Sequence, residues 1–128
     1  MRYLSAQDIL ILHALLVDET VGSHGIRDIG LLQSIEHKPK SSFGEKELYP
    51  GVFLKAAILL EAIANYHIFV DGNKRTAFVA AAHFLAVNGY EIMATNKDVE
   101  KTILSVAEKR LSVEKLSFWL KKNSKKKN

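Results

Sequence analysis

The sequence predicts a single all-α domain, a bundle of about six helices. Apolar residues recur every three or four positions in most segments, which is the spacing of one face of a helix. Ser, Thr or Asp stands where several of these segments begin, and Gly, Asn or Pro where several end. A chain of 128 residues fits one domain, and it shows neither an internal repeat nor a convincing sheet.

Two helices are expected before residue 38. Ser5 can cap the first, with Asp8 three residues further on as in a capping box. Asp28 can cap a second, short helix, which must end before Pro39. The apolar residues at helical spacing are Ile9, Leu12, Leu15 and Leu16 in the first helix and Leu31, Leu32 and Ile35 in the second. Residues 38–49 lose this pattern and predict a polar loop or a loose hairpin.

The third and fourth helices are the most apolar part of the chain. Pro50 suits the first turn of the third helix, which runs towards Tyr66. Because this helix is apolar nearly all round, it is expected at the centre of the bundle. The fourth helix, again rich in Ala, is expected from Thr76 to about Val87.

The C-terminal third predicts two more helices. Residues 88–89, Asn-Gly, are a helix stop and turn signal, and residues 90–92 are expected to be briefly extended. Thr95 or Asn96 can cap the fifth helix, and Ser112 the sixth.

The net charge of +4 comes from the end of the chain. Five lysines between positions 121 and 127 are among the 18 basic residues, and without them 13 basic residues face 14 acidic ones. We expect a domain over residues 1–122 and a disordered, lysine-rich tail over residues 123–128. Nucleic-acid binding through this tail is disfavoured, because the body is not basic and offers no aromatic stacking platform.

The composition also bears on location. The chain has no Cys, which fits a reducing compartment. Its longest apolar run is far below the roughly 20 residues that cross a bilayer, and the N-terminus lacks the features of a signal peptide. We therefore expect a cytoplasmic protein that makes no use of a membrane.

The segment that joins the third and fourth helices is unusually polar for a connection between core helices. It reads HIFVDGNKRT over positions 67–76. The residues that can ionise or form side-chain hydrogen bonds are His67, Asp71, Asn73, Lys74, Arg75 and Thr76. A purely structural connector would not need all of them, so this segment is the candidate for chemistry.

These residue types predict an anion site with a base beside it. Gly72 permits a tight turn and a close approach to a ligand, and the following residues open a helix whose free N–H groups attract phosphate. Lys74 and Arg75 add positive charge. Asp71 would repel a phosphate unless a divalent cation lies between them, which makes it a candidate Mg²⁺ ligand. A histidine such as His67 can accept a proton from a hydroxyl near neutral pH.

The same segment resembles the signature of the Fic/Doc family, which is His-x-Phe-x-Asp/Asn-Gly/Ala-Asn-Gly/Lys-Arg. The matching positions are His67, Phe69, Asp71, Gly72, Asn73 and Arg75. The resemblance extends over most of residues 1–93, through the run Gly-Ile-Arg-Asp at 25–28, Gly-Leu-Leu at 30–32, Tyr-Pro at 49–50 and Asn-Gly-Tyr at 88–90. It implies the helical Fic fold.

Two positions are similar to the Doc subgroup and differ from the AMP-transferring branch. Lys74 stands where that branch has a second Gly, and Phe78 stands where it has a second Arg. The resemblance to Doc implies the toxin of a toxin–antitoxin pair. It implies a kinase that uses ATP and Mg²⁺ to phosphorylate a hydroxyl of a translation elongation factor of the Tu type. A separate antitoxin chain from an adjacent gene would neutralise it, and the sequence shows no internal inhibitory motif.

The resemblance also implies roles for individual residues. His67 is similar to the general base, and Asp71 to the metal ligand. Gly72 and Asn73 resemble the anion-binding turn, with Lys74 and Arg75 on the phosphates. The loop over 38–49 lies where the family has a flap that aligns the target.

Other interpretations remain open on the sequence. An AMP-transferring enzyme is the first alternative, and a non-catalytic binding module on the same scaffold is the second. Asp71 could serve only as a helix cap, and Lys74 with Arg75 could be a solvated helix face. The histidines at positions 13, 24, 37 and 83 show no metal-ligand spacing and are interpreted as structural.

Overall fold

The structure is a computed structural model that describes residues 1–19 and 22–127. Within these residues it has six α-helices, which confirms the all-α prediction. They are α1 (Ala6–Asp18), α2 (Ile29–His37), α3 (Val52–Asn65), α4 (Asn73–Val87), α5 (Asn96–Ala107) and α6 (Val113–Lys122), with a short 3₁₀ turn η1 (Lys38–Lys40) after α2. The strands are β1 (Ser42–Phe43), β2 (Lys46–Glu47), β3 (Tyr90–Ile92) and β4 (Ser124–Lys126).

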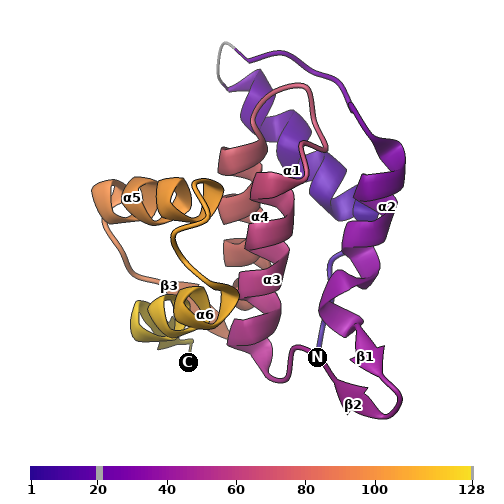
Figure 1. Ribbon diagram of the computed structural model, residues 1–128. Coiled ribbons are helices and arrows are strands. Elements are labelled where there is room, and N and C mark those ends of the chain that lie inside the picture. Colours follow the sequence, from indigo (N-terminus) through magenta and orange to yellow (C-terminus); the bar gives the residue numbers. More distant parts are fainter. Residues whose placement is uncertain (20–21, 128) are drawn as a thin grey trace.

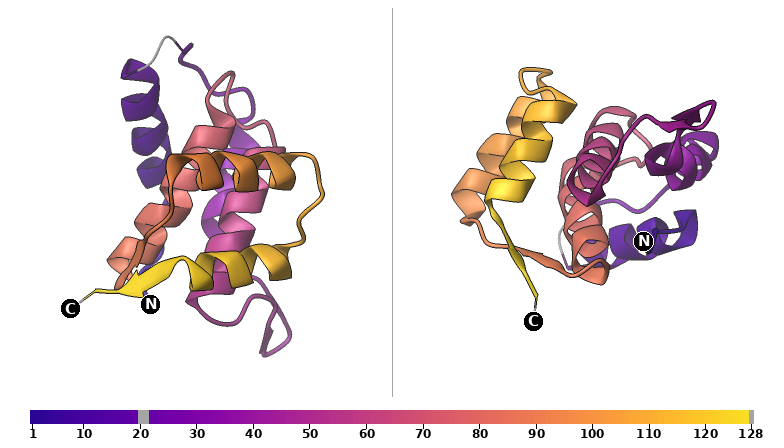
Figure 2. Two further views of the ribbon diagram at one scale, coloured as in Figure 1. Left: turned by 90° about the vertical axis from the view of Figure 1, so that its left-hand side faces the viewer. Right: turned by 90° about the horizontal axis from the view of Figure 1, so that it is seen from below.

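The helices form three layers (Figures 1 and 2). The helices α3 and α4 lie at the centre, with α1 and α2 on one side and α5 and α6 on the other. The central pair is the most buried part of the molecule, as its apolar sequence predicts. The buried positions of α3 include Ala56, Leu59, Leu60 and Ile63, and those of α4 include Ala77, Ala80, Ala81, Phe84 and Leu85.

Four predicted helix caps are present. The Ser5 hydroxyl accepts a hydrogen bond from the Asp8 N–H, and the Asp8 carboxylate accepts one from the Ser5 N–H, which completes the capping box. The side chains of Asp28, Thr95 and Ser112 each accept the N–H of the third residue of α2, α5 and α6. Each such cap satisfies an N–H that the first helical turn leaves unpaired.

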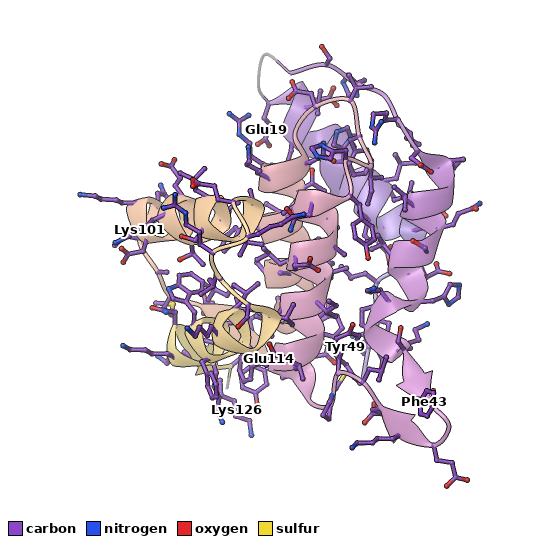
Figure 3. The ribbon with its side chains drawn as sticks, viewed as in Figure 1. Glu19, Phe43, Tyr49, Lys101, Glu114 and Lys126 are labelled. Carbon is purple, nitrogen blue, oxygen red and sulfur yellow. The ribbon has the colours of Figure 1, made fainter. Side chains whose placement is uncertain are left out.

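The loop over 38–49 contains a short hairpin, β1–β2, which lies away from the predicted site. Its Glu47 carboxylate binds the buried Nζ of Lys55 at 2.9 Å, near the beginning of α3. The site segment follows the other end of α3, and in Figures 1 and 3 the hairpin, marked by Phe43 in Figure 3, lies at the opposite end of this helix. The hairpin therefore does not border the site in this structure, and its alignment of a target stays a prediction.

The tail differs from the expected disorder. Ser124–Lys126 form strand β4, which pairs antiparallel with β3 in the register Tyr90–Lys126, Glu91–Lys125 and Ile92–Ser124. The extended segment expected at 90–92 offers unpaired main-chain groups, and these bind the tail. Lysines are also common on exposed edge strands, so the composition that suggested disorder equally suits an edge strand. Residue 128 lies outside the described residues.

One further finding concerns membranes. Among the described residues, no helix combines the length and the apolar character needed to cross a bilayer.

Candidate active site

The predicted site residues surround one cavity. The segment 66–72 joins α3 to α4 at one end of the bundle, at the top of Figure 1. Beside it lies a cavity of about 710 Å³, and six of its lining residues are those that the sequence predicted. They are His67, Asp71, Gly72, Asn73, Lys74 and Arg75. Ala64 and Asn65 at the end of α3, and Ala107 at the end of α5, line its other walls.

The backbone of His67 adopts a left-handed conformation with φ 52°. Residues other than glycine rarely adopt this region, and those that do often lie at functional sites. The His67 carbonyl accepts a hydrogen bond from Arg27 Nε at 2.8 Å. Its imidazole is exposed and makes no hydrogen bond within the described residues. The turn is therefore fixed through the main chain, while the ring stays free to meet a substrate.

The segment 25–28, which precedes α2, fixes the next residues of the turn. The N–H groups of Arg27 and Asp28 both donate to the Ile68 carbonyl, at 2.7 and 3.1 Å, and the Val70 N–H donates to the Gly25 carbonyl at 3.1 Å. Gly25 has φ 138°, which residues with a side chain rarely adopt, and an added Cβ would lie 3.0 Å from Val70, so glycine suits this close approach. A segment far away in sequence thus forms a two-stranded contact with the site turn.

Asp71 lines the cavity with about half of its acceptor capacity available. Its Oδ1 accepts the Gly72 N–H at 2.8 Å, and its Oδ2 accepts the Ser23 N–H at 3.3 Å. A carboxylate has about four acceptor positions, so two remain open. Asp71 is not the cap of α4, because Gly72 occupies that position and α4 has no side-chain cap. The interpretation of Asp71 as a helix cap alone therefore does not hold.

The start of α4 presents unpaired donors to the cavity. Gly72 is left-handed, with φ 79°, and the first intrahelical bond runs from the Thr76 N–H to the Gly72 carbonyl. The N–H groups of residues 73–75 have no partner among the described residues. Such donors, together with the helix dipole, favour an anion. The helix begins three residues earlier than predicted, so these donors belong to the signature itself.

Asn73 closes the turn with its side chain. Its Oδ1 accepts the Phe69 N–H at 3.0 Å, and its Nδ2 donates to the Phe69 carbonyl at 2.9 Å. Both ends of the amide are thus used to close the turn. Asn73 lines the cavity. Because its side chain is already bonded to Phe69, its main-chain N–H is the group that can donate to an anion.

Lys74 and Arg75 supply the positive charge of the cavity. Both are exposed, and neither forms an ion pair or a side-chain hydrogen bond within the described residues. Their charges are therefore not neutralised by a neighbouring carboxylate of the described chain. Phe78, one turn later, packs against the core.

One cation lies behind the turn. Lys38 Nζ is 5.8 Å from the centre of the Tyr66 ring. A side-chain hydrogen bond with Tyr66 raises the pKa of Lys38 above its usual value of 10.5, and this outweighs the opposing effect of its partial burial. Lys38 does not line the cavity.

Asp71 is the cavity residue that would hold a Mg²⁺ ion. The described residues contain no group of three His, Cys, Asp or Glu that could hold an ion by themselves. Mg²⁺ is commonly bound by one or two carboxylates together with substrate phosphates and water. Asp71, with open acceptor positions beside an anion-binding helix start, fits this pattern and would be the protein ligand.

Two contacts of the site were not predicted in detail. The sequence identifies Arg27 only as part of the run at 25–28, and its bond to the His67 carbonyl depends on how the chain folds. The sequence predicts a structural role for His13. It is 2% exposed, and its Nε2 lies 2.8 Å from the Asp71 carbonyl oxygen. The available signal was its spacing, because Ile9, His13 and Val17 form the buried face of α1, and a buried histidine needs a partner.

Comparison with known proteins agrees with this geometry. A family model described as the Fic/DOC family matches residues 3–85. The chain is 37% identical over 100 residues to a protein named toxin Doc from Mycolicibacterium smegmatis, covering 78% of this chain and 74% of the relative. It is 29% identical over 122 residues to the protein kinase doc of Escherichia phage P1, covering 95% of each. With the signature residues around one cavity and a match over most of its length, this chain belongs to the Fic/DOC family.

Proposed function

We propose that this chain is a Doc-type toxin that transfers the γ-phosphate of ATP to a hydroxyl of another protein. One observation carries the proposal. The exposed imidazole of His67, the carboxylate of Asp71 and the uncapped start of α4 with Lys74 and Arg75 line a single cavity. A binding module would need neither a free base nor an open carboxylate at this place.

The residues divide the work of the reaction. The free N–H groups of residues 73–75, with Lys74 and Arg75, hold the phosphates. Asp71 would hold Mg²⁺, which would supply positive charge against the phosphates. The oxygen of the incoming hydroxyl attacks the γ-phosphorus, His67 accepts the hydroxyl proton, and ADP leaves with the electron pair of the broken P–O bond.

Two residues favour phosphate transfer over AMP transfer. Lys74 fills the space that a glycine would leave for a phosphate against the turn, and it offers a point charge in place of open backbone. Phe78 packs into the core and offers no guanidinium to a second phosphate. A nucleotide bound in the orientation opposite to that of the AMP-transferring enzymes places its γ-phosphate near His67.

The proposed partners follow the two named relatives. One relative is named a toxin and the other a protein kinase, which supports a protein substrate and inhibition by an antitoxin from an adjacent gene. We propose a translation elongation factor of the Tu type as the substrate and the cytoplasm as the place of action.

Two labelled forms of ATP test the reaction. The chain is incubated with a bacterial translation extract, Mg²⁺ and ATP labelled at either the α- or the γ-phosphate. Protein label from the γ-position alone is expected. Label from the α-position would show that the chain is an AMP transferase.

A variant tests the role of Lys74 separately. Lys74→Gly is expected to phosphorylate more slowly and to gain some AMP transfer, because the turn then has room for a phosphate. Phosphorylation at the wild-type rate would show that Lys74 does not select the reaction. If neither label is transferred, and expression of the wild-type chain and of His67→Ala arrests bacterial growth equally, the chain is a binding module.

A further inference from the structure

The side chain of His13 connects α1 to the site turn through three contacts. Its ring stacks on the Phe69 ring, with centroids 3.7 Å apart and planes at 6°. Its Nε2 lies 2.8 Å from the Asp71 carbonyl oxygen. A carbonyl oxygen can only accept, so Nε2 carries the proton and donates it. The ring also lies against Gly72, where a Cβ would be 3.7 Å from Cδ2 and Nε2.

The Asp71–Gly72 peptide connects His13 to the Asp71 carboxylate. Its carbonyl accepts from His13, and its N–H, that of Gly72, donates to Asp71 Oδ1 at 2.8 Å. Because the peptide unit is planar, fixing the direction of the carbonyl also fixes the direction of the N–H. The N–H in turn orients the carboxylate that lines the cavity.

This peptide would be easy to rotate without His13. Gly72 lies at φ 79°, and glycine adopts both signs of φ with little cost. A rotation of the peptide plane would turn the Gly72 N–H away from the Asp71 carboxylate. The aromatic stack on Phe69 does not prevent this, because it holds the ring of Phe69, two residues before Asp71, and not the peptide plane.

We propose that His13 is a positioning residue of the active site. Its Nε2–H holds the Asp71–Gly72 peptide in one orientation and thereby aims the Asp71 carboxylate into the cavity. Its effect on the reaction rests on the proposed phosphate transfer, whereas its effect on the peptide does not. The stack on Phe69 alone would not require a hydrogen-bond donor at position 13, whereas the bond to the Asp71 carbonyl does.

Two substitutions separate the hydrogen bond from the stack. His13→Phe keeps an aromatic ring against Phe69 and removes the donor. His13→Gln keeps an N–H at a similar reach and removes the ring. His83→Gln is the control, because His83 is exposed on α4 and has no partner among the described residues.

The readouts are kcat and KM for the target, the Mg²⁺ concentration that gives half-maximal rate, the thermal midpoint and the exchange rate of the Gly72 amide proton. For His13→Phe we expect kcat to fall about tenfold or more. The half-maximal Mg²⁺ concentration and the Gly72 exchange rate should each rise about tenfold, with a smaller change in KM. His13→Gln should recover all three quantities to within about threefold of wild type, although it melts at a lower temperature than His13→Phe.

The opposite ranking would overturn the proposal. If activity follows the thermal midpoint, so that His13→Phe is as active as wild type and His13→Gln is not, His13 only packs. If the wild-type chain transfers no phosphate, the proposed function fails, and Gly72 amide exchange alone decides the role of His13. Equal exchange in wild type and both variants would then refute the positioning role.

Discussion

Replacing Asn73 by Ala tests whether the signature asparagine closes the turn or contacts the ligand. Its amide makes two hydrogen bonds to the main chain of Phe69, at 3.0 and 2.9 Å, and Phe69 is 1% exposed. Each bond contributes about 1 kcal/mol, and a buried group left unpaired costs about 1–3 kcal/mol. We therefore expect Asn73→Ala to lower the free energy of unfolding by about 2–4 kcal/mol.

Urea unfolding measures this loss directly, and the thermal midpoint should fall by about 4 °C for each kcal/mol. Asn96→Ala is a matched control, because Asn96 is exposed at the start of α5 and its side chain has no partner in the described part of the chain. It should change the stability by less than about 0.5 kcal/mol. If Asn73→Ala lost activity at unchanged stability, the Asn73 amide would bind the ligand, and the interpretation that it closes the turn would be wrong.

Three other substitutions test the site and its support. His67→Ala should slow phosphate transfer by about 10²–10⁴-fold with an unchanged melting curve, and a variant that keeps more than about a tenth of the activity would exclude His67 as the base. Asp71→Ala should abolish both activity and the response to Mg²⁺, and superimposable Mg²⁺ titrations of the two proteins would speak against Asp71 as the ligand. Lys55→Met should destabilise the fold by about 2–3 kcal/mol in urea unfolding, because the carbonyls of Pro39 and Tyr49 lose a buried donor; a smaller loss than about 0.5 kcal/mol would show that water replaces it.

The sequence predicts the helices well because their signals are local. The caps at Ser5, Asp28, Thr95 and Ser112 need only residues within one turn, and all four form as predicted. The signature at 67–75 is also continuous in sequence. Its residues are therefore assigned to one site by the sequence alone, because neighbours in a short turn stay neighbours in space.

The remaining features depend on contacts between distant segments. Residues 124–126 form a strand because they pair with the edge of β3, which lies more than 30 positions earlier. The task of His13 is set by a carbonyl 58 positions away. Such pairings are not encoded in periodicity or in local turn signals, so sequence reasoning missed them.

The mass of the modified target tests the central claim most directly. A purified elongation factor of the Tu type is incubated with the chain, ATP and Mg²⁺, and its intact mass is measured beside a reaction that contains His67→Ala. We expect the wild-type chain to add the mass of one phosphate group to the factor and the variant to add nothing on the same time scale. An added AMP group, or an equal gain of phosphate with His67→Ala, would contradict phosphate transfer from a site with His67 as its base.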